Sequence, residues 1–479
     1  MVVQRDFPVH IWGLAAPNQA VAVTFRGESR STHADRLGQW SVYLSPGSEG
    51  GPFDLTVQGE ALLARQGPAA AGPPAQLIVL NDVLVGDVWL ASGQSNMEFP
   101  MSRSATAAQD LPNAANPRIR LLMVRKRASD FAETDIDSDG WTVSSPETAK
   151  DFSAIAWYFA RDISAREHVP IGLIDSTWGG TIAESWVRLT ALGADASLAP
   201  LFVSRGKMTD TEAADRLEAK DQERQVAEAK AAGKPAPQFG WHRQLNSWAP
   251  GMLWNGMIAA LTPFPIRGVL WYQGESNSAL ERAPLYNHVF RALIEDWRRQ
   301  WAIGDFPFLY VQISNYKSTP AEDWGILREQ QRLTLEMRNT AMAVTIDIGN
   351  PDDVHPTDKV DVGLRLARAA RALTYGETTL EYNGPSFRQV TPEGPVLRAW
   401  FDHAKGLTAK GGDVTGFEVA GADGKFVPAS AKIEGETIVV SSPAIAEPVD
   451  VRYGWPNSPQ CNLFNSDGLP ASPFTSLHE

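Results

Sequence analysis

From about residue 81 the chain alternates apolar, strand-like runs with helical segments, and this rhythm restricts the fold more than any other feature. The strand-like runs are VLVGDVWL (83–90), IRLLMV (119–124), PIGLID (170–175), IRGVLWYQ (266–273), FPFLYVQI (306–313) and AMAVTIDI (341–348). Strands that are apolar throughout are buried on both faces, which is typical of parallel sheets covered by helices. We therefore expect an α/β fold with a parallel, doubly wound sheet that binds its ligand beyond the carboxyl ends of the strands.

Two regions of short, alternating segments flank this part of the chain. Residues 1–80 contain VAVTFRG, QWSVYLS and FDLTVQG, divided by Gly, Pro and Ser, and the same signature returns from about residue 380. This pattern indicates small antiparallel β-sandwiches. The Pro- and Gly-rich stretch 65–76 indicates a surface loop or linker. We predict an N-terminal β-sandwich domain (1–80), a central α/β domain (81–378) and a C-terminal β-rich domain (379–479).

Residues 190–250 interrupt the rhythm of the central region. The stretch TEAADRLEAKDQERQVAEAKAAGKPAPQ predicts a highly charged helix that Gly233 and Pro235 stop. A helix of this kind is either a solvated insertion or a cap over a binding site, and the sequence is compatible with both.

Composition excludes several classes of function. The chain has 43% hydrophobic and 21% charged residues, so we expect a globular protein with a large core and no transmembrane helix. A net charge of −13 disfavours nucleic acid and anionic membranes as partners. The single cysteine, Cys461, excludes an internal disulfide framework and a Cys-rich metal site. The strand-like beginning of the sequence is compatible with a cytoplasmic protein, or with a periplasmic or secreted one after removal of a signal peptide.

The first candidate for chemistry is Ser95, in the pentapeptide GQSNM that follows the strand-like run 83–90. A serine hydroxyl is a weak nucleophile and needs a base within hydrogen-bond reach, together with donors for the oxyanion that forms on attack. Gly93 permits a tight turn at the carboxyl end of the strand, and the turn exposes the serine. The Ser95 amide can itself face an anion. Ser95 is therefore a candidate nucleophile if other strand ends supply its partners.

The base candidate lies in NPDDVHPTDK (350–359), after the last strand-like run. His355 would reach the sheet edge that carries the serine, and Asp352, at D-x-x-H spacing, would orient its ring. Asp353 and Asp347 are alternative acids. There is no H-E-x-x-H motif and no second histidine near position 355, so we expect no metal site and no cofactor.

Two further strand ends add polar groups to the same edge. DSTWGGTIAESW (175–186) contains the pair Gly179–Gly180, whose backbone N–H groups can face an oxyanion. WYQGESN (271–277) places Gln273 there, and a side-chain amide could complete the oxyanion hole. Four polar motifs at four strand ends are hard to attribute to chance.

These motifs resemble those of a known family. GQSNM, STWGGT, WYQGESN and the late D-x-x-H-P are similar to the sialate O-acetylesterase group of SGNH-type carbohydrate esterases, and the resemblance extends over nearly the whole chain. It implies a flavodoxin-like α/β/α catalytic domain that hydrolyses acetyl esters on sugars without metal or cofactor. It also implies that Ser95 is the nucleophile and His355 the base. Gly180 (or Gly179) and Gln273 would join the Ser95 amide in the oxyanion hole.

The same motifs supply candidates for holding the sugar. Those closest to the strand ends are Gln94, Trp178, Glu184, Glu275 and Asn277. Trp186, Trp254, Trp271 and Arg188 are further candidates, although core packing is the more frequent role of tryptophan in a chain with 16 of them. The expected partner is an O-acetylated sugar or oligosaccharide.

Two alternatives to a sialate esterase stay open. An acetylesterase for xylan or xyloglucan would use the same mechanism with a different cleft. A carbohydrate-binding protein with a degenerate hydrolase core belongs to another class, and the retention of Ser95, His355 and Gln273 argues against it.

Overall fold

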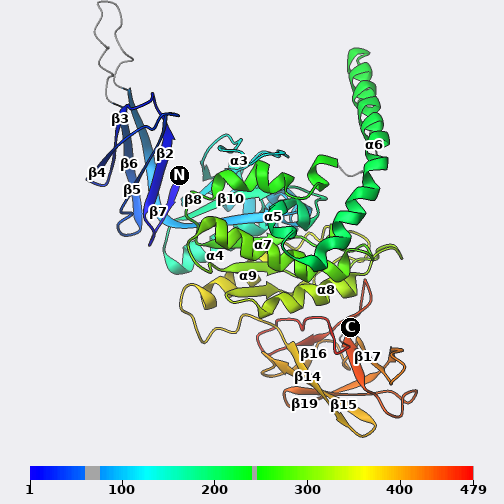
Figure 1. Cartoon of the computed structure of the whole chain (residues 1–479). Coiled ribbons are helices and arrows are strands. Elements are labelled where there is room, and N and C mark those ends of the chain that lie inside the picture. Colours follow the sequence, from blue (N-terminus) through cyan, green and yellow to red (C-terminus); the bar gives the residue numbers. More distant parts are fainter. Residues whose placement is uncertain (60–75, 240–244, 478–479) are drawn as a thin grey trace, which may run out of the picture.

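The computed structural model of the chain describes residues 1–59, 76–239 and 245–477, and its centre is a sheet of seven strands (Figure 1). In spatial order the strands are β13 (Thr340–Ala343), β12 (Phe308–Val311), β11 (Gly268–Tyr272), β7 (Gln76–Gly93), β10 (Ile171–Thr177), β8 (Asn116–Met123) and β9 (Thr142–Ser144). Every neighbouring pair is parallel except β8 and β9. The predicted parallel α/β sheet is therefore confirmed.

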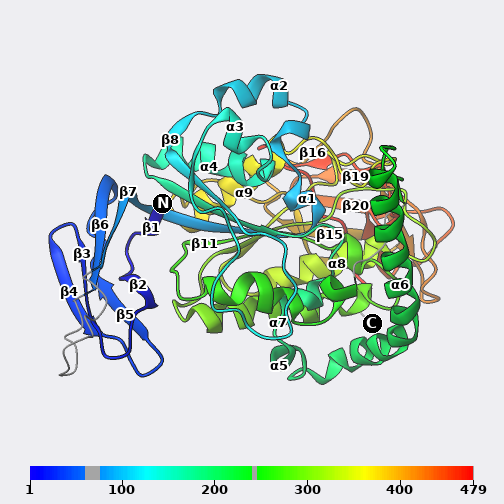
Figure 2. The same cartoon turned by 90° about the horizontal axis from the view of Figure 1, so that it is seen from above.

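Helices cover both faces of this sheet. Figure 2 shows α4 (Ala154–Glu167) and α9 (Val360–Leu373) on one side, and α7 (Tyr286–Trp301) and α8 (Trp324–Leu333) on the other. On α7 the apolar residues Val289, Leu293 and Trp297 recur at helical spacing and are buried against the sheet. The strands between these layers are apolar on both faces because both faces are covered. None of the helices in the described ranges is long and apolar enough to cross a membrane.

Strand β7 connects the central sheet with the N-terminal β region. Its first half pairs with β6 (Gly50–Gly59) and β1 (Val2–Gln4), and its second half lies between β10 and β11. Strand β7 continues through residue 80, the predicted end of the N-terminal domain. Its apolar sequence extends on both sides of Asp82, where the backbone has a positive φ. Of the predicted linker 65–76, only its last residue lies within the described part of the chain.

Antiparallel sheets form the two ends of the chain. The N-terminal strands are β2 (Val9–Leu14), β3 (Ala20–Phe25), β4 (Glu28–His33), β5 (Gln39–Leu44) and β6. The C-terminal sheets contain β14 (Ser386–Glu393), β15 (Val396–Asp402), β16 (Thr408–Ala409), β17 (Phe417–Ala420), β18 (Val427–Pro428), β19 (Ser430–Glu434), β20 (Thr437–Ser441), β21 (Asp450–Tyr453), β22 (Leu463–Phe464) and β23 (Phe474–Thr475).

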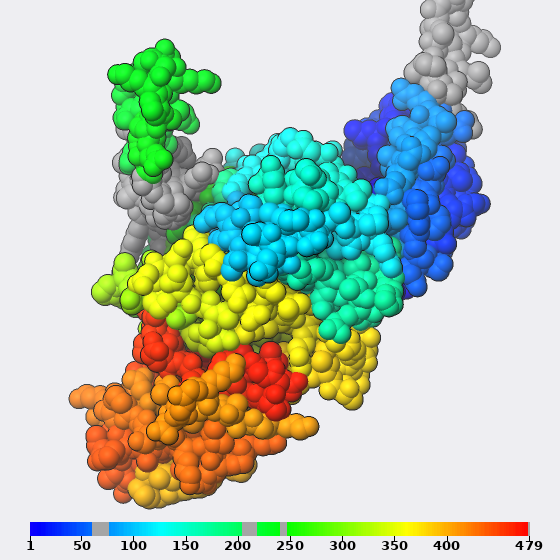
Figure 3. Space-filling view, turned by 180° about the vertical axis from the view of Figure 1, so that it is seen from behind, coloured from blue at the N-terminus to red at the C-terminus, as the bar shows by residue number. Residues whose placement is uncertain are grey.

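Each of the three regions encloses a separate hydrophobic cluster. The space-filling view in Figure 3 shows the N-terminal region (blue) and the C-terminal region (orange to red) against different sides of the central part. We keep the division into three domains as a proposal that these separate cores support. The predicted β-rich character of the C-terminal region is confirmed.

The charged segment forms α6 (Ala199–Ala231), which projects beyond the rest of the molecule (Figure 1). It ends just before Gly233, which has a φ of +65° and stops a helix without strain. After α6 the chain returns through the 3₁₀ turn Leu245–Trp248 (η5). There Trp248 Nε1 donates to the Gly180 carbonyl at 2.7 Å, so the end of the insertion contacts a loop of the carboxyl sheet edge.

Candidate active site

Ser95 begins the short helix α1 (Ser95–Glu98) directly after β7, and its Oγ lies 2.8 Å from Nε2 of His355. The turn between strand and helix requires glycine at position 93. Gly93 has a φ of +129°, and a Cβ there would meet the Tyr272 carbonyl oxygen at 2.2 Å. The Gln94 N–H donates to that same carbonyl at 2.9 Å, which holds the turn against the end of β11. The structure thus brings the two residues expected to carry the chemistry into hydrogen-bond contact.

Among the three candidate acids, Asp353 lies nearest to His355. Its Oδ1 accepts the His355 backbone N–H at 2.9 Å and lies 3.7 Å from the ring atom Nδ1. The first choice, Asp352, instead accepts from Lys317 Nζ at 2.9 Å and is largely exposed. Asp347 forms a two-point ion pair with Arg365. The loop geometry therefore favours the alternative acid over the D-x-x-H aspartate.

The imidazole of His355 is suited to accept a proton at neutral pH. Burial lowers the pKa of His355, and the cations Lys359 and Arg103 lower it further. The carboxylates of Asp353 and Glu98 oppose this shift without reversing it. A lowered pKa keeps the ring neutral, so that Nε2 can act as the acceptor for the Ser95 hydroxyl.

The two glycines of the loop after β10 differ in whether their backbone N–H is already used. The Gly179 N–H donates to Oε2 of Glu98 at 2.5 Å, so it is not available to a ligand. The Gly180 N–H donates to no acceptor in the described part of the chain. A Cβ on Gly179 would lie 3.1 Å from Ser95 Cβ, which places this loop directly against the serine. Of the two glycines predicted for an oxyanion hole, the geometry favours Gly180.

Gln273 is fully buried, and its amide is used inside the protein. Its Nε2 donates to Asn277 Oδ1 at 2.7 Å, to the Thr181 carbonyl at 3.1 Å and to Gln94 Oε1 at 3.2 Å. Its Oε1 accepts from the Tyr286 hydroxyl at 2.9 Å. Two N–H hydrogens shared among three acceptors leave none for an oxyanion. These contacts favour a role for Gln273 in holding the strand-end loops together over the predicted role in the oxyanion hole.

Most of the predicted sugar contacts are also interior groups. Glu184 and Asn277 are each 1% exposed and hydrogen-bond to each other, and Glu184 also forms an ion pair with Arg282 at 2.9 Å. Glu275 accepts from the Asn96 side chain. Three tryptophans considered for sugar binding, namely Trp186, Trp254 and Trp271, are packed in the core, as is more usual for this residue.

Two of the predicted sugar contacts keep groups that could face a ligand. Trp178 is half-buried. Gln94 uses its Oε1 internally, while its Nε2 donates to no described residue. The further candidate Arg188 is held in an ion pair with Asp296 at 2.6 Å. The buried candidates therefore lie in the protein interior and do not face a ligand.

A pocket of about 670 Å³ opens beside the Ser95–His355 pair. Its lining consists of Ser95, Glu98, Phe99, Pro100, Arg103, Met123, Val124, Arg125, Lys126, Asp151, Asp175, Thr177 and His355. Three Lys or Arg side chains line this pocket, and two of them form ion pairs. Arg125 pairs with Asp137 and Asp139, and Lys126 pairs with Glu98. Arg103 lies over the Phe99 ring at 4.7 Å and pairs with no carboxylate among the described residues.

Sequence reasoning missed this lining because it comes from segments on either side of the motifs. The sequence did indicate one part of the lining. VRKR (124–127) comes at the end of the strand-like run 119–124, so it had to lie at the same sheet edge. Arg103 carried no such signal, since its place depends on how residues 99–104 fold back after α1.

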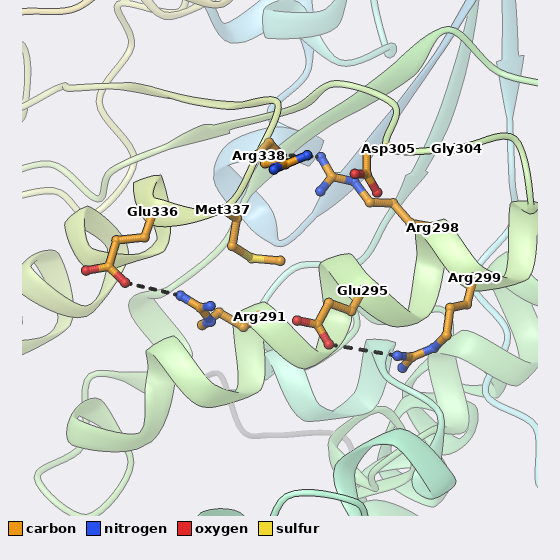
Figure 4. Close-up of a pocket in the computed structure, with 9 residues that line it drawn as sticks. All are labelled: Arg291, Glu295, Arg298, Arg299, Gly304, Asp305, Glu336, Met337 and Arg338. Atoms are coloured by element: carbon orange, nitrogen blue, oxygen red, sulfur yellow. Dashed lines mark hydrogen bonds and ion pairs between the residues drawn. The ribbon is translucent and has the colours of Figure 1, made fainter.

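A second pocket, of about 480 Å³, lies at the opposite edge of the sheet (Figure 4). It is formed by the end of α7 and the segments just before β12 and β13. Its charges are largely paired, with Arg291 beside Glu336 at 3.5 Å and Arg299 beside Glu295 at 3.8 Å. It holds none of the predicted residues. In the described ranges no three His, Cys, Asp or Glu side chains are grouped closely enough to share a metal ion.

Comparison with known proteins defines the class of this protein. A family model described as carbohydrate esterase, sialic acid-specific acetylesterase, matches residues 240–372. The crystal structure of a carbohydrate acetylesterase from Xanthomonas citri matches with a TM-score of 0.84 and 37% sequence identity, over 100% of this chain and 97% of that one. The fold and the site thus belong to a carboxylic ester hydrolase of the carbohydrate esterase class.

Curated relatives narrow the class to one family. Sialate O-acetylesterase from Mus musculus is 30% identical over 520 residues, which cover 99% of this chain and 92% of the mouse protein. The Homo sapiens enzyme of the same name is 30% identical over 532 residues, which cover 100% of this chain and 91% of the human protein. The chain belongs to the sialate O-acetylesterase family. The resemblance seen in its motifs is confirmed.

Proposed function

We propose that the chain is a serine esterase that removes O-acetyl groups from sugars by a two-step acyl transfer. The observation that carries this proposal is the 2.8 Å contact between Ser95 Oγ and His355 Nε2 at the edge of a pocket. Ser95 Oγ attacks the acetyl carbonyl carbon while Nε2 takes the hydroxyl proton. The bond between the carbonyl carbon and the sugar oxygen then breaks, and that oxygen takes the proton from Nε2. Water then attacks the acetyl carbon while Nε2 takes a proton from it. The bond between that carbon and Ser95 Oγ breaks, Oγ takes the proton from Nε2, and acetate leaves.

The negative charge that forms on the carbonyl oxygen needs preorganised donors. We assign this role to the backbone N–H groups of Ser95 and Gly180. The Gly180 N–H is free, its loop lies against Ser95, and its carbonyl is held by Trp248 at 2.7 Å. Gln94 Nε2, next to the serine in sequence, is a side-chain donor that no described acceptor uses. Asp353 acts on His355 through its charge and through the backbone hydrogen bond.

For the substrate we propose an O-acetylated sialic acid, a sugar that carries a carboxylate. The names of the curated relatives, sialate O-acetylesterases, support this choice, and so does Arg103. Arg103 is the pocket cation that no described carboxylate neutralises, and a guanidinium is the side chain best matched to a carboxylate. A neutral acetylated xylan or xyloglucan fragment offers no partner for this charge.

The test is acetate release from a panel of substrates, with Ser95→Ala measured alongside the parent. The panel holds 9-O-acetyl sialic acid, acetylated xylo-oligosaccharides, acetylated xyloglucan fragments and an aryl acetate. We expect the highest kcat/KM on the sialic acid, and Ser95→Ala to lose at least about 10³-fold on every substrate. Preference for a xylan or xyloglucan fragment would overturn the substrate assignment and leave the mechanism intact.

Labelling with an organophosphonate separates the esterase from a carbohydrate-binding protein. We expect one equivalent of label on Ser95 in the parent and none in Ser95→Ala. A chain that binds the sugars, resists the label and releases no acetate would overturn the enzymatic proposal. The same labelling reaction counts active sites, so later kinetic comparisons can be expressed per competent molecule.

A further inference from the structure

Beside the Ser95–His355 pair lies a buried hydrogen-bond network that the proposed mechanism does not use. Lys359 Nζ donates to Oδ1 of Asn96 at 2.6 Å, and Nδ2 of Asn96 donates to Oε1 of Glu275 at 2.5 Å. Asn96 and Lys359 are each 1% exposed. Because Asn96 follows Ser95 directly in the chain, the network adjoins the proposed nucleophile.

Burying the lysine of this network costs free energy of folding. No carboxylate in the described ranges lies within ion-pair distance of Lys359, whose Nζ lies instead over the Phe99 ring at 4.7 Å and the Tyr272 ring at 5.7 Å. Burial lowers the pKa of Lys359 to about 7. Burying an amine disfavours folding unless its contacts compensate. Among the described residues, the hydrogen-bond acceptor of Lys359 Nζ is the Asn96 side chain, so Lys359 acts on the site mainly through Asn96.

The two charged residues give the Asn96 amide one orientation. Its oxygen faces the ammonium of Lys359 and its nitrogen faces the carboxylate of Glu275. A flipped amide would turn N–H groups toward a cation and an oxygen toward an anion, so both contacts would become repulsive. The other oxygen of Glu275, Oε2, is buried with no hydrogen-bond partner among the described residues, so the Asn96 amide is the side-chain donor that Glu275 has there.

The fixed amide has a further contact that reaches the base. Asn96 Nδ2 also donates to the Val354 carbonyl at 2.9 Å, and Val354 precedes His355. Ser95 and His355 are 260 residues apart in the chain and come from different loops. Asn96 therefore ties the turn that carries the serine to the loop that carries the histidine, one residue away from each.

We propose that Lys359 and Glu275 are positioning residues: by orienting the Asn96 amide they set the distance and angle between Ser95 Oγ and His355 Nε2. The inference rests on the proposed function, in which those two atoms exchange a proton. A misplacement of reacting groups by about 1 Å can lower a rate about 100-fold. The loss of a single hydrogen bond at this position can therefore lower the catalytic rate. Neither positioning residue belongs to the lining of the pocket beside Ser95.

The network also has an electrostatic consequence at the base. His355 is faced by the carboxylates of Asp353 and Glu98 and by the cations of Lys359 and Arg103. The Lys359 charge lowers the pKa of His355, so its removal raises that pKa. The acidic limb of kcat/KM, which follows deprotonation of the base, then moves to higher pH.

The primary test is Lys359→Met, which keeps an unbranched side chain and removes the charge and the donor. Rates are measured on an aryl acetate per organophosphonate-reactive site. We expect kcat to fall about 10- to 100-fold, with KM changed by no more than about twofold and the acidic limb moved to higher pH. Lys317→Met is the matched control: this exposed lysine pairs with Asp352 in the neighbouring loop, and both readouts should equal those of the parent.

A second variant keeps the inference testable if Lys359→Met does not fold. Asn96→Asp retains the size of the side chain and the oxygen that faces Lys359, but it loses the donations to Glu275 and Val354. We expect the same fall in kcat at unchanged KM. A parental kcat and acidic limb in whichever variant folds would overturn the inference. With such a result, an inactive Ser95→Ala would mean that the positioning role is wrong and the proposed function stands. Turnover by Ser95→Ala would mean that the proposed function itself is wrong.

Discussion

Oδ1 of Asp353 lies 3.7 Å from Nδ1 of His355 and accepts the backbone N–H of the same residue at 2.9 Å. The carboxylate thus holds the histidine through the main chain, while its contact with the ring is longer than a hydrogen bond. Across this distance the negative charge favours the imidazolium that forms during attack, and it raises the pKa of His355 against the larger effect of burial.

Replacing Asp353 by Asn should therefore reduce the rate and move the pH profile. The backbone contact can persist, since the Asn oxygen still accepts, but the charge is lost. We expect kcat to fall about 10- to 100-fold, less than the roughly 10⁴-fold known for a serine protease whose aspartate bonds the ring directly. Burial already lowers the pKa of His355, and loss of the opposing Asp353 charge should move the acidic limb of kcat/KM to still lower pH than in the parent.

Asp352→Asn is the control for this prediction. Asp352 points to Lys317 and is largely exposed, so its loss should leave both kcat and the acidic limb unchanged. A large loss of kcat in Asp352→Asn with a parental Asp353→Asn would show that the loop rearranges when substrate binds.

Gln273→Ala should destabilise the protein more than it slows the reaction. The truncation removes a donor from the acceptors on Gln94, Thr181 and Asn277 in a fully buried site. Asn277 keeps the Ala183 N–H and Gln94 keeps the Ser276 N–H, so the Thr181 carbonyl is the acceptor left without a donor among the described residues. An unsatisfied buried group costs about 1–3 kcal/mol, and we expect the free energy of unfolding to fall by that amount. Urea unfolding measures this loss. Loss of an oxyanion donor would instead lower kcat about 10²- to 10³-fold per labelled active site.

The sheet and the shared edge of Ser95 and His355 were predictable because they depend on patterns within single segments. A strand that is apolar on both faces, such as 83–90, has to be buried on both, and parallel strands bring their carboxyl ends to one edge. Ser95 and His355 follow two such strands, β7 and β13, so both lie at that edge. Since β11 and β12 separate the two strands, the contact itself depends on the path of the loop after β13.

The direction of individual side chains was not predictable, because contacts between segments decide it. Gln273 follows a strand end as Ser95 does, yet Thr181 and Asn277 capture its amide in the interior. The D-x-x-H spacing favoured Asp352, but that carboxylate is exposed and pairs with Lys317, which lies in another loop. Spacing in a loop does not determine which of two adjacent aspartates turns toward the histidine.

Arg103→Ala should affect the proposed acidic substrate selectively. A hydrogen-bonded contact with a charged group is worth about 1.5–3 kcal/mol, so we expect KM for 9-O-acetyl sialic acid to rise about 10- to 100-fold. The KM for an aryl acetate, which carries no carboxylate, should stay the same. Since the Arg103 charge lowers the pKa of His355, the acidic limb should also move to higher pH.

Arg127→Ala is the matched control for Arg103. Arg127 pairs with Glu133 at 2.8 Å and does not line the pocket, so its loss should change neither KM nor the acidic limb. If Arg103→Ala raised KM equally for 9-O-acetyl sialic acid and for acetylated xylo-oligosaccharides, the arginine would be shaping the pocket and not recognising a carboxylate.

Asp175 should make the stability of the protein depend on pH. This residue at the end of β10 is 3% exposed and accepts from the Thr177 hydroxyl at 2.7 Å and the Ser153 N–H at 3.2 Å. Burial raises its pKa from 3.8 to about 7. Between these two values the folded protein holds a proton that the unfolded chain has released. The contribution of Asp175 to stability is therefore present below about pH 4 and is lost as pH rises through 7.

Asp175→Asn removes the titrating group and should flatten that part of the stability curve. The slope contributed by one such group is at most about 1.4 kcal/mol per pH unit, and urea unfolding at several pH values between 4 and 8 measures it. Asp151→Asn serves as the control, because this carboxylate lines the same pocket but is 71% exposed. Its curve should run parallel to that of the parent. If the Asp175→Asn curve also ran parallel, Asp175 would be ionised in the folded protein, and its two donors would be stabilising a carboxylate.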